Sequence, residues 1–167
     1  MQKTKSARPK PELSRIAAEL QRAYNGDAWH GPPMTKALEG ITHNHAAIKP
    51  IPEAHSIWQI VRHLTAWNQI VHRRFLGELV KVSPEQDWPP IEDFSADAWA
   101  ADLDALHRAC RAFISELKKA AKQPGCDSVL HRKVRGKTHN VYVMLHGGVQ
   151  HNLYHTGQIS ILRKALD

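Results

Sequence analysis

Residues 54–79 read AHSIWQIVRHLTAWNQIVHRRFLGEL, and their apolar side chains recur at intervals of three and four residues. This spacing predicts one long helix with an apolar face, because an α-helix completes a turn every 3.6 residues. The apolar positions are Ile57, Ile60, Val61, Leu64, Trp67, Val71 and Phe75. His63 falls between Ile60 and Trp67, so we expect a histidine on the side of this helix that faces the core.

The rest of the chain repeats this pattern, and no segment has a convincing strand pattern. Long helices are predicted over about 12–24, 95–122 and 140–166, with a short helix over 34–42. Proline and glycine interrupt the helical patterns between these segments. The sequence therefore predicts an all-α fold, a four-helix bundle with long connections at 80–94 and 125–137. Connections of this length allow a crossover topology as well as an up-and-down one.

The length and charge of the chain point to one domain with a basic tail. We expect residues 11–167 to form a single helical domain and residues 1–10 to be a disordered tail. Four of the seven net positive charges lie in this tail, on Lys3, Lys5, Arg8 and Lys10. A second basic run spans 132–137, but no helix presents a basic face with interleaved aromatic residues. Nucleic-acid binding is therefore a disfavoured hypothesis.

Cysteine use and hydropathy indicate a cytoplasmic protein. Cys110 and Cys126 do not have the spacing of a metal or redox motif. No apolar run has the length of a signal peptide core or of a membrane span. Two free thiols and the lack of an export signal favour a reducing compartment, so we predict a cytoplasmic location with no membrane partner.

Among twelve histidines, His151 and His155 stand apart because they lie four residues apart on a predicted helix. Residues at this spacing project from one face, so both imidazoles can reach one ion. The alternative is a pair of ordinary amphipathic positions, one hydrogen-bonded and one in solvent. Asn152 follows the first histidine, where zinc proteases with an H-E-x-x-H motif carry a catalytic glutamate, so a protease of that type is disfavoured.

His63 is the third candidate ligand, although taken alone it is better explained as a core histidine hydrogen-bonded to a carbonyl or hydroxyl group. With His151 and His155 facing it in a bundle, a three-histidine site becomes a hypothesis.

Gly147 and Gly148 near the start of the last helix each lower helix stability by about 1 kcal/mol relative to alanine. We expect them to mark a close approach to the backbone. The remaining polar-context histidines are predicted to lie at the surface, in loops or on exposed helix positions: His43, His45, His72, His107, His131 and His139.

Three segments resemble the DinB-like (YfiT-like) superfamily: YNGDAWHGP at 24–32, HSIWQIVRHLTAW at 55–67 and HNLYHTGQI at 151–159. The resemblance extends over nearly the whole chain from about residue 12. It implies a four-helix bundle that holds a divalent ion on His63, His151 and His155, and it implies homodimers. Zinc or nickel is the expected metal, with iron as an alternative. Some relatives are S-transferases or isomerases that use a low-molecular-weight bacterial thiol.

These observations lead to two main functional hypotheses. The first is a metal-dependent enzyme acting on a small molecule, either a hydrolase or a thiol-dependent S-transferase. The alternative is a non-catalytic stress-response or binding module that the metal stabilises. Candidate residues for lining the site are His30, on the turn at 29–31, and Gln158, one turn beyond His155. Trp58 and Trp67 are predicted to belong to the core.

Overall fold

The computed structural model describes residues 10–166, and this part of the chain is all-α, as predicted. Its only β-type pairing within the described residues is an isolated bridge between Lys133 and Asn140. The predicted tail, residues 1–10, lies outside the described residues except for Lys10. The helices are α1 (Glu12–Asn25), α2 (Met34–Leu38), α3 (His43–Ala47), α4 (Ile57–Phe75), α5 (Pro84–Asp87), α6 (Ala96–Ala120), the 3₁₀ helix η1 (Cys126–His131) and α7 (Val141–Lys164).

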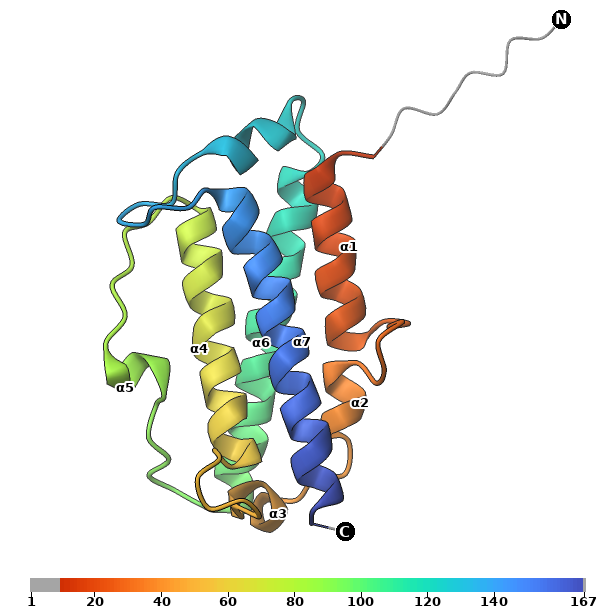
Figure 1. Ribbon diagram of the computed structural model, residues 1–167, viewed down its shortest axis with the longest axis vertical. Helices are drawn as coiled ribbons and strands as arrows, with labels where there is room; N and C mark the ends of the chain where they lie inside the picture. Colours follow the sequence, from red (N-terminus) through yellow and green to blue (C-terminus); the bar gives the residue numbers. More distant parts are fainter. Residues whose placement is uncertain (1–9, 167) are drawn as a thin grey trace, which may run out of the picture.

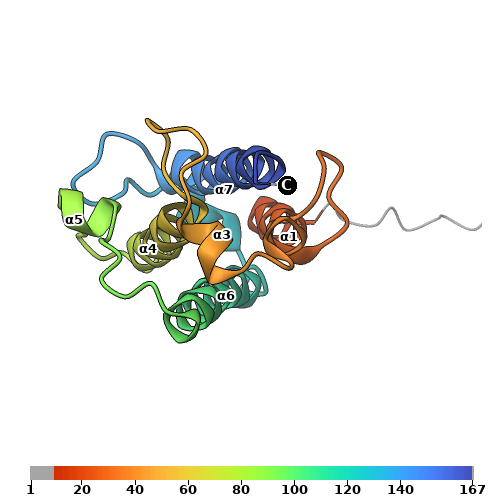
Figure 2. The same cartoon turned by 90° about the horizontal axis from the view of Figure 1, so that it is seen from below.

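The long helices α1, α4, α6 and α7 pack lengthwise against one another (Figure 1). In the end-on view of Figure 2, α4 and α1 occupy opposite corners, and α6 and α7 occupy the other two. Both α4 and α1 contact α6 on one side and α7 on the other. One face of α7 is therefore turned toward α4, and a different face is turned toward α1.

The bundle has the crossover topology that the long connections allowed. Helices α4 and α6 run in the same direction although they are consecutive long helices, and α1 and α7 run in the opposite direction (Figure 1). Residues 76–95 therefore have to return along the outside of α4 before α6 begins. The short helix α5 forms within this return segment and lies beside α4.

Local signals explain where α4 begins and ends, and they make it shorter than the predicted 54–79. At the start, the Ser56 side chain accepts a hydrogen bond from the Gln59 amide, and the Gln59 side chain accepts one from the Ser56 amide. At the end, Gly77 adopts a φ of +97°, which L side chains rarely adopt. The amides of Gly77 and Glu78 bond to the carbonyls of Arg74 and Arg73, which closes the helix.

Other predicted elements need similar adjustment. The short helix predicted over 34–42 ends at Leu38, before Gly40 with its φ of +76°. His43 and His45 do not lie in a loop as predicted, because Thr42 caps the short helix α3 that contains them. Ser95 caps α6 as predicted, through a bond from the Ala98 amide. The first helix has no cap of its own, and the Asp127 carboxylate accepts bonds from the Glu12 and Leu13 amides instead.

One continuous apolar core joins the long helices, and the largest of its fully buried side chains is Trp58. The Trp58 indole N–H donates to Asp102 on α6 at 2.7 Å, so this tryptophan belongs to the core as predicted. None of the described helices has both the length and the hydropathy that crossing a membrane requires.

Candidate metal centre

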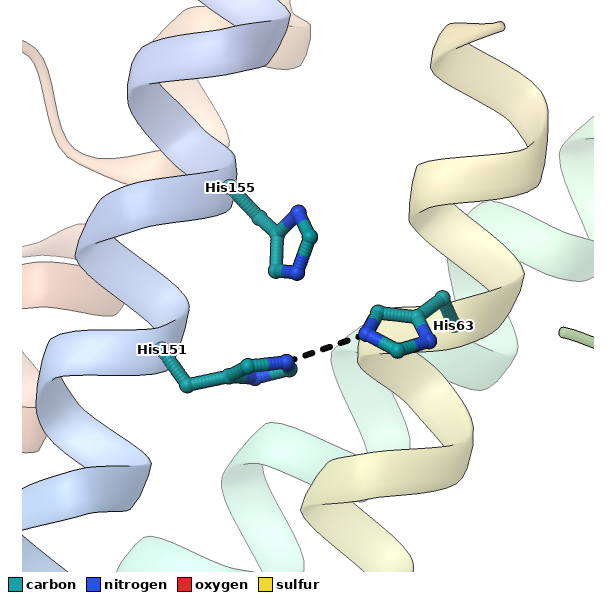
Figure 3. Close-up of side chains that lie close together, drawn as sticks. All are labelled: His63, His151 and His155. Carbon is teal, nitrogen blue, oxygen red and sulfur yellow. Dashed lines mark hydrogen bonds between the residues drawn. The ribbon is translucent and has the colours of Figure 1, made fainter. Parts of the chain in front are cut away.

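His63, His151 and His155 lie together between α4 and α7, and their imidazole rings point toward one another (Figure 3). One nitrogen of each ring lies within 4.8 Å of a nitrogen of each of the others. The Nε2 atoms of His63 and His151 are 3.0 Å apart. His63 and His155 are buried, and His151 is half-buried. The helix that carries the i, i+4 pair therefore faces the helix that carries the predicted third histidine.

The outer nitrogen of His63 is held by the return segment. His63 Nδ1 lies 2.6 Å from the backbone carbonyl oxygen of Asp87, the last residue of α5. A carbonyl oxygen only accepts hydrogen bonds, so Nδ1 carries the proton and Nε2 keeps its lone pair. The Asp87 carboxylate accepts a hydrogen bond from the Trp67 indole at 2.6 Å, which ties α5 to α4.

The outer nitrogen of His155 is held by Gln158, one turn further along α7. His155 Nδ1 lies 2.6 Å from Gln158 Oε1, and Gln158 Nε2 donates to the Tyr154 hydroxyl at 3.1 Å. An amide oxygen also only accepts hydrogen bonds, so Nδ1 of His155 carries the proton. The lone pair on His155 Nε2 is therefore available to bind an ion. Outer contacts of this kind orient imidazoles that bind metals. Gln158, predicted to line the site, is in contact with it through His155.

Burial keeps the three imidazoles neutral. It lowers the pKa of His63 and of His155, and together with the neighbouring His155 and His63 it lowers the pKa of His151 to about 4. Neutral imidazole is the form that binds metal ions. Because His63 carries its proton on Nδ1, His151 is the donor in the bond between their Nε2 atoms. Binding an ion there requires His151 to move that proton away from Nε2.

The donor set fits a divalent transition metal. Two nitrogens on a tetrahedral zinc ion, each about 2.1 Å from it, lie about 3.4 Å apart. The 3.0 Å separation between His63 and His151 and the 4.8 Å limit for the trio bracket that value. Small side-chain adjustments therefore suffice for the three histidines to hold one ion. Imidazole ligands suit zinc, nickel and iron, and they do not distinguish between these metals.

Trp88, directly after α5, covers His63 with its ring. The two rings stack with centroids 3.9 Å apart, and His55 stacks on the other face of Trp88 at 3.5 Å. The prediction treated this region as a plain connection and gave it no role. A signal was present in Ser83-Pro84-Glu85-Gln86, where the serine and glutamine form a capping box around α5. Sequence spacing alone did not reveal that this helix would return to His63.

Two open hollows flank the histidines. The first, of about 460 Å³, is lined on the site side by His155, Gln158, Tyr154, Trp88 and His55, and we call it the Gln158 hollow. The second, of about 370 Å³, adjoins His151, and we call it the Arg74 hollow. The residues that line it come from α4, α7 and the segment before α7: Trp67, Asn68, Val71, Arg74, Lys137, His139, Val143, Met144, Gly147, Gly148, His151 and Asn152. The histidine cluster is therefore accessible to small molecules from two sides.

The structure does not bring His30 to the cluster. His30 is exposed and lines a separate hollow with Arg22 of α1 and Val149 and Leu153 of α7. Its turn follows α1, which lies diagonally opposite α4 (Figure 2). The face of α7 that meets this turn is consequently not the face that carries His151 and His155. Trp67, predicted as core, is half-buried and lines the Arg74 hollow beside His151.

Asn152 occupies a structural position between the two α7 histidines. It is 3% exposed, and its side-chain amide pairs with that of Asn68 on α4 through reciprocal bonds of 3.1 and 3.3 Å. The place where an H-E-x-x-H protease has its glutamate is thus filled by an amide that joins the two helices.

Comparison with known proteins places the chain in a family. A model of the DinB superfamily matches residues 28–159, a range that includes the three histidines, Asp87 and Gln158. Searches of curated proteins and of solved structures find no match. Because the family match covers most of the 167 residues, the chain belongs to the DinB superfamily.

Proposed function

We propose that this protein is a metal-dependent enzyme that activates a low-molecular-weight thiol on an ion held by His63, His151 and His155. The observation that carries the proposal is the convergence of three neutral imidazoles, two of them oriented by outer hydrogen bonds, between two open hollows. Zinc or nickel is the proposed metal, with iron as the alternative.

A divalent ion on three neutral ligands keeps its full charge and an open position, and it lowers the pKa of a thiol or a water that binds there. The chain's own residues prepare that position. Asp87 and Gln158 keep the Nε2 lone pairs of His63 and His155 available for the ion. Trp88 stacks against His63 and shields that ring from solvent.

The side chains around the site favour a thiol over water as the nucleophile. Hydrolysis gains from a general base positioned beside the attacking water. Of the nearby carboxylates, Asp87 is engaged by the Trp67 indole, and Glu53 is an exposed residue of the Gln158 hollow. A thiol would need no such base, because an ion held by these histidines would favour the thiolate and its proton would pass to solvent. The thiolate would then displace a leaving group from an electrophilic carbon, and the leaving group would depart with its electron pair.

The proposal extends to the cellular setting. A thiol co-substrate requires a reducing compartment, and Cys110 and Cys126 are both free thiols. We therefore propose a cytoplasmic location. We also propose that the protein acts as a homodimer, as the family resemblance implies.

Metal content and thiol binding test the proposal together. Purified protein loaded with Co²⁺ should acquire a sulfur-to-cobalt charge-transfer absorption when a small thiol is added, and the zinc form should alkylate that thiol with a model alkyl halide. Absence of the absorption band, with turnover of an ester substrate instead, would replace the thiol transferase by a hydrolase. If neither reaction occurs but a chelator lowers the melting temperature, the metal-stabilised binding module is the correct function.

A further inference from the structure

The Arg74 hollow is lined by a buried arginine that forms no ion pair with any of the described residues. Arg74 lies in the last turn of α4 and is 5% exposed. Its Nη2 donates to the Val80 carbonyl at 2.9 Å, but its buried Nε has no hydrogen-bond partner among the described residues. Burial lowers the pKa of this guanidinium, with no charged neighbour contributing to the shift. Buried arginines are normally paired, so an unpaired one requires an explanation.

Its place at a helix C-terminus explains only part of this arrangement. A cation there interacts favourably with the helix dipole, and the bond to Val80 satisfies one donor. The guanidinium carries five N–H donors in a planar fork that matches a carboxylate. Its Cζ lies 5.8 Å from the centroid of the Trp67 ring, and both side chains line the hollow. Arg74 therefore lines an open space with a guanidinium that makes one side-chain hydrogen bond among the described residues, although its unpartnered Nε is itself shielded from solvent.

Two glycines keep that space open. Gly147 lies on the same face of α7 as Val143 and His151, four residues from each. A Cβ atom at Gly147 would have no neighbour within 4 Å, and one at Gly148 would make an ordinary contact of 3.7 Å with Val71. The close approach expected at these glycines is thus not made by another part of the described chain. Neither packing nor a positive φ requires glycine here, yet each costs helix stability.

The remaining lining residues define the chemistry of a ligand. Val71, Val143 and Met144 are apolar, Lys137 adds a second positive charge, and no Asp or Glu lines the hollow. Its volume of about 370 Å³ lies within the usual range for small-molecule sites, about 300–1,000 Å³. His151 of the histidine cluster is one of the residues that line this hollow.

We propose that the Arg74 hollow binds a small molecule with an apolar body and one carboxylate, held by the Arg74 guanidinium, with its other end directed toward His151. This inference rests on the proposed function for the identity of the reacting end, which is the thiol or its partner. The carboxylate binding itself does not depend on the metal. The two ideas can therefore fail separately.

Calorimetric titration of metal-free full-length protein with 4-phenylbutanoate and with its neutral amide tests the carboxylate site. We expect the acid to bind at least tenfold more tightly than the amide. Arg74→Met should abolish this preference without weakening the amide. Gly147→Leu should weaken the binding of both probes, because it places a side chain in the hollow while leaving Arg74 intact. This variant tests the site even if Arg74→Met does not fold. Gln150→Leu adds the same side chain at an exposed position of α7 and should bind both probes like the wild type.

Equal binding of acid and amide, or unchanged binding of the acid to Gly147→Leu, would overturn the inference. Titration of the zinc-loaded protein with ω-sulfanyl carboxylates of increasing chain length then tests the link to the metal. We expect zinc to tighten binding at the chain length that joins Arg74 to the ion. If the carboxylate preference is present but elemental analysis finds that the protein binds no metal, the proposed function fails while the carboxylate site stands.

Discussion

The α1–α6 half of the bundle and the α4–α7 half bury different kinds of side chain. Within residues 10–166, α1 and α6 bury no charged or amide side chain. All the buried polar or charged residues belong to α4, its N-cap or α7: Ser56, His63, Asn68, Arg74, Asn152, His155 and Thr156. Burying polar groups lowers stability unless they find partners, so the polar side chains of the α4–α7 half need hydrogen bonds or a ligand that the apolar α1–α6 half does not need.

Truncation of an apolar side chain in the α1–α6 half should have the largest effect on folding. Phe113 on α6 is 2% exposed. We expect Phe113→Ala to lower the free energy of unfolding by about 3–5 kcal/mol, because it removes buried apolar area and leaves a cavity. Urea denaturation measures this change. Metal stoichiometry should remain that of the wild type, and loss of metal from the folded variant would break the proposed division between the two halves.

Removal of a histidine ligand in the α4–α7 half should abolish metal binding and leave the stability of the metal-free protein almost unchanged. Zinc at a thousandfold excess over its dissociation constant should stabilise the wild type by about 4 kcal/mol. We expect His155→Ala and His63→Ala to lose this gain and to retain little metal on elemental analysis. Each substitution also removes the cost of burying a polar imidazole. Without metal, the variants should therefore unfold near the urea midpoint of the metal-free wild type. Unchanged metal content would show that the ion is held elsewhere.

Acidification should destabilise the metal-free protein, with His151 of the α4–α7 half as the main contributor. The folded-state pKa of His151 is about 4, below the ordinary value of 6.5, so the unfolded chain binds more protons between these values. The free energy of unfolding of metal-free protein should therefore fall as the pH falls from about 6.5 to 4, by as much as about 3 kcal/mol. Urea titrations across this range measure the slope. His151→Gln should flatten it, and an unchanged slope would assign the effect to other groups.

The smallest expected effect concerns the hydrogen bond that orients His155. Gln158→Leu removes the acceptor for His155 Nδ1 and should weaken metal binding about 10- to 100-fold. Gln158→Glu keeps an acceptor oxygen and should restore most of the affinity. Competition with a fluorescent zinc chelator measures both. Gln150→Leu, on the exposed side of α7, is the matched control. Equal affinity of Gln158→Leu and wild type would leave Gln158 without a role in positioning.

The helices and the pairing of His151 with His155 were predictable because their signals are local. Apolar periodicity located α1, α4, α6 and α7 to within a few residues, and Ser95 marked the start of α6. The i, i+4 spacing of His151 and His155 placed both on one face. The family resemblance added His63 as their partner. The prediction for His30 did not identify a residue of the cluster, because the helix patterns do not say which corner of the bundle each helix occupies.

The sequence by itself determined an all-α chain and most of the residues that face inward, and with the family resemblance it named the three histidines that the structure brings together. Only the tertiary structure decided that α4 and α6 run parallel, so that the return segment brings the Asp87 carbonyl to His63 and Trp88 onto its ring. It also decided that Gly147 and Gly148 face an open hollow beside Arg74, whose Nε has no hydrogen-bond partner among the described residues. Helix formation depends on neighbours three and four residues apart, whereas these contacts join residues that only the packing of the bundle brings together.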